Sequence, residues 1–193
     1  MKKKNLFLIP GFGQQATDKH FSWLVRFLQS KKFIVIRVPM KWKNKVMADY
    51  INQFKEFYIK NKSNNNYVLG FSYGAVIAFA TATELKPRKI YLCSLSPYFK
   101  EDLIKMKPWT HKLIGKNRMA DSKTRSGKRI AKKLITPTVL FYGEKEARDF
   151  PQLKLRSEET VKLSKNSKLI IVKKAPHDIS NPNYMEAIKK EFK

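Results

Sequence analysis

The feature of this sequence that most directly indicates chemistry is a serine placed between two glycines. The segment Gly70 to Gly74 reads G-x-S-x-G, with strand-like residues before it and an alanine-rich, helix-like stretch after it. A serine in that context occupies a strained strand-to-helix turn, and the flanking glycines let the two elements approach closely. The helix N-terminus also offers N–H groups and a favourable dipole to a developing oxyanion. The sequence therefore predicts a nucleophile at Ser72.

A histidine must accompany this serine, because a hydroxyl is a weak nucleophile unless a base accepts its proton. The chain has three histidines. His20 precedes the serine and His111 lies in a long basic segment, whereas His177 follows the last strand-like segment. The chain order serine, acid, histidine requires the base after that strand. His177 is therefore the predicted general base.

A carboxylate after the fifth strand-like segment would hold the imidazole in the correct tautomer and stabilise its cation. Three acids follow that segment: Glu144, Glu146 and Asp149. We favour Glu146, because its spacing after Gly143 suits a side chain that turns back over the sheet. Asp149 is the alternative acid, and Glu144 is interpreted as solvated. Glu101 and Asp102, which follow the fourth strand-like segment, are less favoured.

An oxyanion needs two N–H donors, and the sequence offers one on each of two loops. The first is the N–H of Tyr73, the residue after the predicted nucleophile. The second is the N–H of Phe12, in the glycine-containing loop Pro10 to Gly13. Such turns also bind phosphates, but the chain has neither a G-x-G-x-x-G nor a G-x-x-x-x-G-K-[S/T] motif. A nucleotide cofactor is therefore not expected.

The elements that must position these residues alternate between strand-like and helix-like segments, the pattern of a parallel sheet covered on both faces. The expected strands are 6–9, 33–38, 67–71, 89–94, 138–142 and 168–172. The expected helices are 21–28, 47–58, 75–85 and one that begins at Pro182 with Asn181 as its N-cap. We expect an α/β fold over residues 1–193 as a single domain, a three-layer α/β/α sandwich with a mostly parallel six-stranded sheet.

Residues 98–133 interrupt this alternation between the fourth and fifth strands. They contain twelve Lys or Arg residues against three acids, together with the aromatic side chains of Phe99 and Trp109. A connection of this length is usually functional or disordered. We expect a basic, lid-like excursion here, with short helical pieces around Ile104 and Ile130.

Together these motifs resemble those of the α/β-hydrolase superfamily, and the resemblance covers nearly the whole chain. Gly70 to Gly74 is similar to the nucleophile elbow, and the loop at Pro10 to the oxyanion loop, where the family often has histidine. Gly143 to Glu146 is similar to the G-x-x-D acid turn, with Glu in place of Asp, and His177 matches the catalytic histidine region. The resemblance implies a compact hydrolase fold without the first two strands, with a lid at 98–133.

The chain is strongly basic, with 41 Lys and Arg residues against 15 Asp and Glu and a formal net charge of +26. A field of that size attracts polyanions such as nucleic acid, anionic lipid or an acidic protein. No nucleic-acid-reading motif is present, so no specific nucleic acid is expected. A solvated, lysine-rich surface is the simpler interpretation of the charge.

Composition also bears on cofactors and location. The only cysteine, Cys93, excludes an intramolecular disulfide and a thiolate metal cluster, so we expect no metal and no cofactor. The apolar run Leu6 to Ile9 is too short for a signal peptide or a membrane span. We therefore expect a soluble, cytoplasmic protein without a transmembrane segment.

These features predict a serine hydrolase that cleaves an ester or thioester of a small acyl substrate through an acyl-enzyme. Ser72, His177 and Glu146 would form its triad. The basic excursion suggests an acidic carrier protein as a further partner, docked electrostatically beside the pocket. The alternative hypothesis is a binding protein on a hydrolase-like fold, whose basic surface contacts nucleic acid, anionic membrane or an acidic protein.

Overall fold

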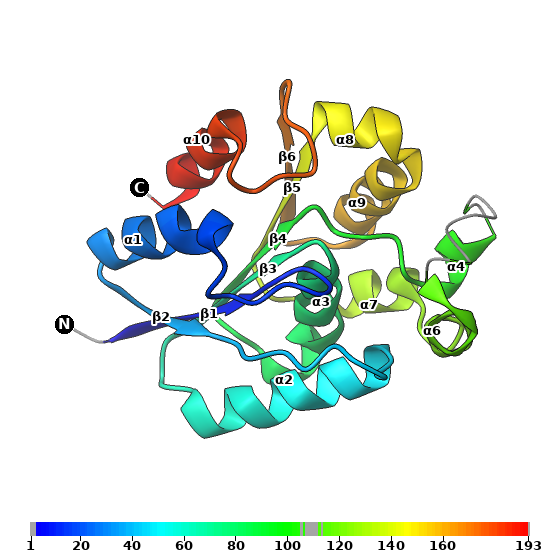
Figure 1. Ribbon diagram of the computed structural model, residues 1–193, viewed down its shortest axis with the longest axis horizontal. Coiled ribbons are helices and arrows are strands. Elements are labelled where there is room, and N and C mark those ends of the chain that lie inside the picture. The colour runs from blue at the N-terminus through cyan, green and yellow to red at the C-terminus, as the bar shows by residue number, and fades with distance from the viewer. Residues whose placement is uncertain (1–2, 105, 107–111, 113, 193) are drawn as a thin grey trace.

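Six strands form one sheet in which every neighbouring pair is parallel (Figure 1). The computed structural model describes residues 3–104, 106, 112 and 114–192, and the strand order is β2-β1-β3-β4-β5-β6. The strands are β1 Lys4–Ile9, β2 Phe33–Arg37, β3 Asn66–Phe71, β4 Lys89–Cys93, β5 Thr138–Gly143 and β6 Ser167–Val172. The expected α/β fold is confirmed, and the sheet is wholly rather than mostly parallel.

The helices alternate with these strands along most of the chain. They are η1 Lys19–Phe21, α1 Ser22–Ser30, α2 Met47–Asn61, α3 Tyr73–Leu85, α4 Lys100–Leu103, α6 Lys116–Ser122, α7 Gly127–Lys133, α8 Glu144–Asp149, α9 Pro151–Leu163 and α10 Pro182–Glu191. The expected helical pieces of the excursion 98–133 are present as α4 and α7, with α6 between them. Trp109 and His111 lie outside the described residues.

The helices α8 and α9, between β5 and β6, were not predicted from the sequence. The buried residues of α9 show why. Three of the four residues that α9 buries are polar, namely Arg156, Ser157 and Thr160, and the fourth is Leu153. A helix with a polar buried face lacks the apolar stripe by which periodicity detects a helix.

Helices cover both faces of the sheet, so the molecule has the expected three layers (Figure 1). On one face, α1 and α10 pack through an apolar cluster that includes Leu24, Leu28, Tyr184 and Ile188. On the other face, α2, α3 and α7 pack through a cluster that includes Phe54, Val76, Phe79 and Ala131. None of the described helices is long and apolar enough to cross a membrane.

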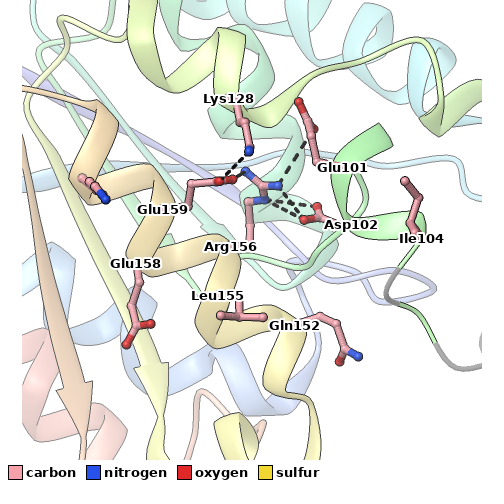
Figure 2. A pocket seen from close by; sticks show the side chains of 10 residues that line it. Glu101, Asp102, Ile104, Lys128, Gln152, Leu155, Arg156, Glu158 and Glu159 are labelled. Atoms are coloured by element: carbon pink, nitrogen blue, oxygen red, sulfur yellow. Dashed lines mark hydrogen bonds and ion pairs between the residues drawn. The ribbon is translucent and has the colours of Figure 1, made fainter.

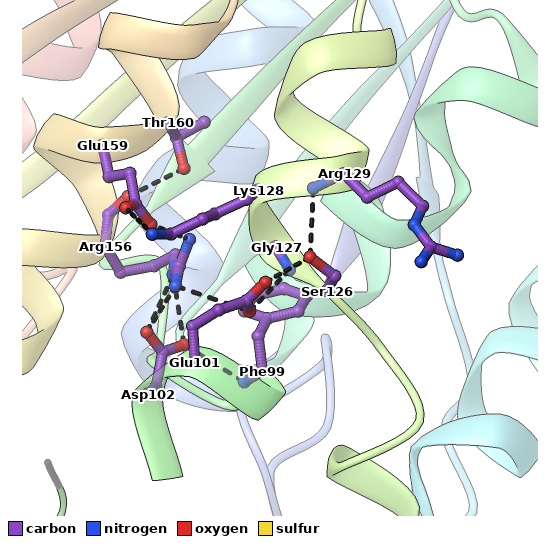
Figure 3. Close-up of polar contacts among 10 residues, drawn as sticks. All are labelled: Phe99, Glu101, Asp102, Ser126, Gly127, Lys128, Arg129, Arg156, Glu159 and Thr160. Atoms are coloured by element: carbon purple, nitrogen blue, oxygen red, sulfur yellow. Dashed lines mark hydrogen bonds and ion pairs between the residues drawn. The ribbon is translucent and has the colours of Figure 1, made fainter. Parts of the chain in front are cut away.

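A buried arginine joins the excursion to α9 (Figures 2 and 3). Arg156 is 2% exposed, and its Nε donates to both carboxylate oxygens of Asp102 at 3.0 and 3.1 Å. Its Nη1 donates to Glu159 Oε2 at 2.8 Å, and its guanidinium lies 5.3 Å from the ring centre of Phe99. A buried guanidinium is tolerated only with such partners, since an unpaired buried charge is costly. These contacts fasten α4 to α9.

The same arrangement holds α7 in place (Figure 3). Glu101 accepts hydrogen bonds from the Ser126 hydroxyl and, at 3.1 Å, from the Gly127 N–H. Lys128 pairs with Glu159 at 3.1 Å. These residues, with Arg156, Asp102 and Phe99, are called the Arg156 cluster below. The cluster connects α4 and α7, near the two ends of the excursion, to α9. Both ends of the excursion are therefore held in place.

Candidate active site

Ser72 occupies the turn between β3 and α3. Its backbone has φ 55° and ψ −117°, a conformation that residues other than glycine rarely adopt. Its N–H donates to Cys93 O at 2.8 Å, which ties the turn to the end of β4. A Cβ on Gly70 would lie 2.3 Å from Gly74 O, and one on Gly74 would lie 2.4 Å from Ile9 O. Both positions therefore require glycine, and the serine is held in a strained turn.

His177 lies in the loop after β6, beyond the carboxyl end of that strand, and its side chain contacts Ser72. Its Nε2 lies 2.9 Å from Ser72 Oγ. Its ring packs on Phe71 with ring centres 5.0 Å apart, and its side chain is 36% exposed. The Ser96 hydroxyl lies 3.3 Å from Ser72 Oγ on another side. The serine hydroxyl therefore has an imidazole nitrogen at hydrogen-bond distance.

Glu146 lies in the first turn of α8, directly after β5, and is 1% exposed. Its Oε1 lies 2.7 Å from His177 Nδ1. Its Oε2 accepts hydrogen bonds from the Ser94 hydroxyl and from the Gly143 N–H, both at 2.9 Å. Both carboxylate oxygens are thus engaged, which fixes the orientation of the carboxylate toward the imidazole.

Two residues that the sequence did not indicate, Ser94 and Tyr184, complete these surroundings. Ser94, just after β4, has φ 58° and donates its hydroxyl to Glu146. The Tyr184 hydroxyl, from α10, lies 2.9 Å from Ser94 Oγ and 3.3 Å from Phe141 O. The Ser94 hydroxyl gives its proton to Glu146, so Tyr184 is the donor between the two hydroxyls, and burial raises the pKa of Tyr184 well above its usual range. Helical periodicity can mark Tyr184 as a core residue, but only the fold reveals what its hydroxyl touches.

The other candidate acids lie away from the imidazole. Asp149, the alternative, ends α8 with a side chain that is 57% exposed and lies 3.5 Å from Arg148. Glu144 accepts a hydrogen bond from the backbone of the loop after β6. The two acids after β4 belong to the Arg156 cluster. His20 lies in η1 against the ring of Phe21, on the α1 side of the sheet.

The loop after β1, which we predicted as the oxyanion loop, lies beside Ser72. A Cβ on Gly11 would lie 3.4 Å from Ser72 Cβ. The Gly11 N–H donates to Gln14 Oε1 at 3.0 Å, and the Gln14 N–H donates to Gly11 O at 3.1 Å. The N–H groups of Gly11 and Ser72 are therefore engaged within the fold. Those of Phe12 and Tyr73 stay our prediction for the oxyanion donors.

Aromatic side chains surround this side of the site. The Phe12 ring is 48% exposed, and its centre lies 5.5 Å from those of Trp42 and Tyr73. Tyr73 also contacts Tyr98, with ring centres 4.9 Å apart. Burial raises the pKa of Tyr73, and its hydroxyl has no hydrogen-bond partner among the described residues. The side chains on this side of Ser72 are therefore mostly apolar.

Metal-binding groups are not gathered at this site. Within the described ranges, no three His, Cys, Asp or Glu side chains are grouped so that they could hold a metal ion. Cys93 is fully buried, and burial raises the pKa of its thiol well above the usual range. The groups available for chemistry here are the serine hydroxyl, the imidazole and the carboxylate.

Several solved structures are similar in fold to this chain. Est1E from Butyrivibrio proteoclasticus matches with a TM-score of 0.76 at 16% identity, over 99% of this chain and 86% of that chain. The Pyrococcus furiosus esterase Pf2001 matches with a TM-score of 0.72 at 18% identity, over 99% and 82%. The α/β-hydrolase domain-containing protein 10 from mouse matches with 0.71 at 13% identity, over 99% and 89%. No protein-family model and no curated protein sequence matches the chain.

At identities of this order the likeness concerns the fold. The chain has the α/β-hydrolase fold, as the sequence motifs implied. Its sheet has six parallel strands, and Ser72, His177 and Glu146 all follow the carboxyl ends of strands in that sheet. This is the edge at which open parallel α/β sheets place their ligand sites.

Proposed function

We propose that the protein is a serine hydrolase that cleaves esters or thioesters of small acyl groups through an acyl-enzyme. The observation that carries this proposal is the continuous contact from Glu146 to His177 to Ser72, with distances of 2.7 and 2.9 Å. A buried carboxylate, an imidazole and a hydroxyl in this order are the groups that activate a serine nucleophile. An esterase among the similar structures agrees with this class.

The acylation step follows from these positions. Ser72 Oγ attacks the carbonyl carbon while His177 Nε2 accepts its proton, and Glu146 stabilises the imidazolium through Nδ1–H. The tetrahedral oxyanion accepts hydrogen bonds from the N–H groups of Phe12 and Tyr73. When the intermediate collapses, the bond to the leaving oxygen or sulfur breaks. The His177 proton then passes to that leaving group.

Deacylation uses the same residues in the reverse order. Water attacks the Ser72 ester, and His177 removes the water proton as the second tetrahedral intermediate forms. Collapse breaks the bond between the acyl carbon and Ser72 Oγ, which takes the proton back from His177. The carboxylic acid leaves and the free serine is restored. No step needs a cofactor.

The surroundings of the serine favour an acyl group of modest size with apolar character. Phe12, Trp42, Tyr73 and Tyr98 offer aromatic contacts on one side of the nucleophile. An acidic carrier protein is part of this proposal, since the excursion 98–133 carries many lysines and arginines. In that case salt would slow turnover of a carrier-bound thioester much more than turnover of a small neutral ester.

Labelling with a fluorophosphonate probe, followed by mass mapping, tests the proposal directly. We expect one adduct per chain on Ser72, no adduct in Ser72→Ala, and an unchanged position of labelling in Ser96→Ala. Ser96 is the matched control, because its hydroxyl lies 3.3 Å from the nucleophile. A folded wild-type protein that is not labelled would refute the proposal. The alternative of a basic binding surface would then be tested with anionic partners.

A further inference from the structure

We infer that the protein has an anion-binding site beside its nucleophile, formed by Arg118, Lys45 and Lys116, and that its preferred substrate carries a carboxylate or phosphate group. The inference rests on the proposed function and adds to it the charge of the substrate. It starts from a cavity of about 460 Å³ where the loop before α2 meets the start of α6. Two short segments line this cavity, residues 44–46 and 114–118.

The lining of the cavity is suited to an anion. Among the described residues that line it, the charged ones are Lys45, Lys116 and Arg118, and none is an acid. Asn44 and Asn117 add side-chain amides, which can donate hydrogen bonds. A cavity with three cations, two amides and no carboxylate is complementary to a carboxylate or a phosphate.

Arg118 is held in place before any ligand binds. Its Nε donates to Lys45 O at 3.0 Å, and its Nη1 donates to Ile114 O at 3.3 Å. Its guanidinium stacks over the Phe12 ring, 4.7 Å from the ring centre. A guanidinium has five N–H donors, so two bonds to carbonyls leave others for a ligand. A preorganised arginine binds an anion with less loss of side-chain entropy than a free one.

Two acids on the helices that border the cavity are engaged elsewhere. Asp121 pairs with Arg125 at 2.6 Å, and Asp49 accepts the N–H of Val46 at 2.9 Å. Within the part of the chain that the structure describes, the three cations of the cavity form no ion pair. Arg156 differs, since Asp102 and Glu159 neutralise it. The charge of Arg118 is thus available to a ligand.

Arg118, in the lining of the cavity, is linked to the proposed oxyanion donors through ring contacts. Arg118 contacts Phe12, and the Phe12 ring lies 5.5 Å from the Tyr73 ring. Phe12 and Tyr73 are the two residues whose N–H groups we propose as oxyanion donors. A small substrate with its carbonyl at Ser72 can therefore place an anionic group at Arg118. The group could belong to the acyl chain or to the leaving group.

Two matched pairs of substrates test this inference and separate the two sources of charge. The first pair is 4-nitrophenyl butyrate and the mono-4-nitrophenyl ester of glutaric acid, which adds a carboxylate to the acyl chain. The second pair is S-acetyl-pantetheine and S-acetyl-4′-phosphopantetheine, which adds a phosphate to the leaving thiol. Rates in Ser72→Ala are subtracted as the blank. We expect kcat/KM at low salt to be about tenfold higher for the charged member of one pair.

Arg118→Gln is expected to abolish this preference, whereas Arg26→Gln is expected to keep it. Arg26 is the matched control, an exposed arginine on α1, which packs on the other face of the sheet. If Arg118→Gln does not fold, the exposed double variant Lys45→Gln/Lys116→Gln replaces it, with a reduced preference expected. Inorganic phosphate should also inhibit hydrolysis of the preferred charged substrate competitively, and less strongly in the variant.

The outcomes distinguish this inference from the proposed function. If the neutral esters are not hydrolysed in a Ser72-dependent way, the proposed function is wrong. If they are hydrolysed but neither charged member is preferred, the anion site is wrong and the hydrolase stands. The same holds if the preference persists undiminished in Arg118→Gln. A preference within the first pair assigns the charge to the acyl group, and one within the second pair assigns it to the leaving thiol.

Discussion

The molecule contains two buried networks built around a carboxylate and a nitrogen base, and they differ in what the base can do. In the Arg156 cluster, Asp102 faces a guanidinium that is 2% exposed and is surrounded by acids. Near β5, Glu146 faces the imidazole of His177, whose second nitrogen lies 2.9 Å from a serine hydroxyl. Each carboxylate also accepts a backbone N–H.

This difference teaches that a buried ion pair alone does not identify a reactive site. A guanidinium cannot give up its proton in proteins, so Arg156 can only hold elements together. An imidazole exchanges protons near neutral pH, and its side chain here is 36% exposed, within reach of a substrate. We therefore expect loss of activity from changes in the second network and loss of stability from changes in the first.

The largest expected effect is the loss of activity in Ser72→Ala. Removal of a triad nucleophile lowers kcat by about 10⁴- to 10⁶-fold. The free energy of unfolding should change by about 1 kcal/mol or less, because the Ser72 hydroxyl contacts only the partly exposed imidazole of His177 and, at 3.3 Å, the Ser96 hydroxyl. Ester hydrolysis and urea unfolding of the same preparations measure both quantities. Substantial residual hydrolysis in Ser72→Ala would contradict the assignment of the nucleophile.

Arg156→Met is expected to do the opposite. It leaves Asp102 as an uncompensated buried carboxylate, which costs about 3–5 kcal/mol of unfolding free energy. The double variant Arg156→Met/Asp102→Leu should recover part of this loss, since it removes the stranded charge. Urea unfolding measures these values.

The matched control for Arg156→Met is Lys189→Met, which breaks an exposed pair with Glu186 at 2.9 Å. Its cost should stay below about 1 kcal/mol. Arg156→Met protein that remains folded should label at Ser72 as wild type does. If it instead unfolds no more easily than Lys189→Met, the Arg156 cluster does not anchor the excursion.

A smaller effect is expected from Ser94→Ala, which removes one hydrogen bond to Glu146. Loss of a bond to a charged group is worth about 1.5 kcal/mol, so kcat should fall about tenfold while KM stays unchanged. Steady-state kinetics with a neutral ester separates the two parameters. Ser94 acts through Glu146 and is a positioning residue.

Ser157→Ala is the control for Ser94→Ala. Ser157 is also fully buried, in α9, and its hydroxyl has no hydrogen-bond partner among the described residues. Ser157→Ala should leave kcat unchanged. Tyr184→Phe removes the donor to Ser94 and should lower kcat by a few-fold. A fall in KM alone, or equal effects of Ser94→Ala and Ser157→Ala, would show that Ser94 has only a packing role.

The smallest expected effect concerns pH and the Arg156 cluster. Burial opposes ionisation of Glu101, but the Ser126 hydroxyl, the Gly127 N–H and Arg156 outweigh it and lower the pKa of the carboxyl. A carboxyl with a lowered pKa stabilises the fold above its unfolded pKa, about 4, and loses that contribution as pH falls further. Glu101→Gln should therefore cost about 1 kcal/mol at pH 7 and much less at pH 3. Urea unfolding at both pH values checks this, and an equal cost at both would contradict it.

The sequence alone was sufficient to predict the strands and helices that have a local hydrophobic periodicity. The six strands and the helices with apolar stripes were predicted because burial against a sheet imposes a periodicity. Ser72 and its turn were predictable because close approach admits only glycine at Gly70 and Gly74. The polar helix α9 was not, since Arg156 stands at a position where periodicity expects an apolar residue.

The site residues also divide into those that the sequence predicted and those that only the tertiary structure revealed. Chain order indicated His177 as the base and favoured an acid in the short segment after β5, because each must follow a particular strand. The choice between Glu146 and Asp149 depended on how α8 turns, and the tertiary structure places only Glu146 beside the imidazole. Ser94, Tyr184 and Arg118 meet their partners across long stretches of chain. A sequence fixes which groups exist and the order in which they occur, but contacts between distant segments arise only when the sheet and its layers have packed.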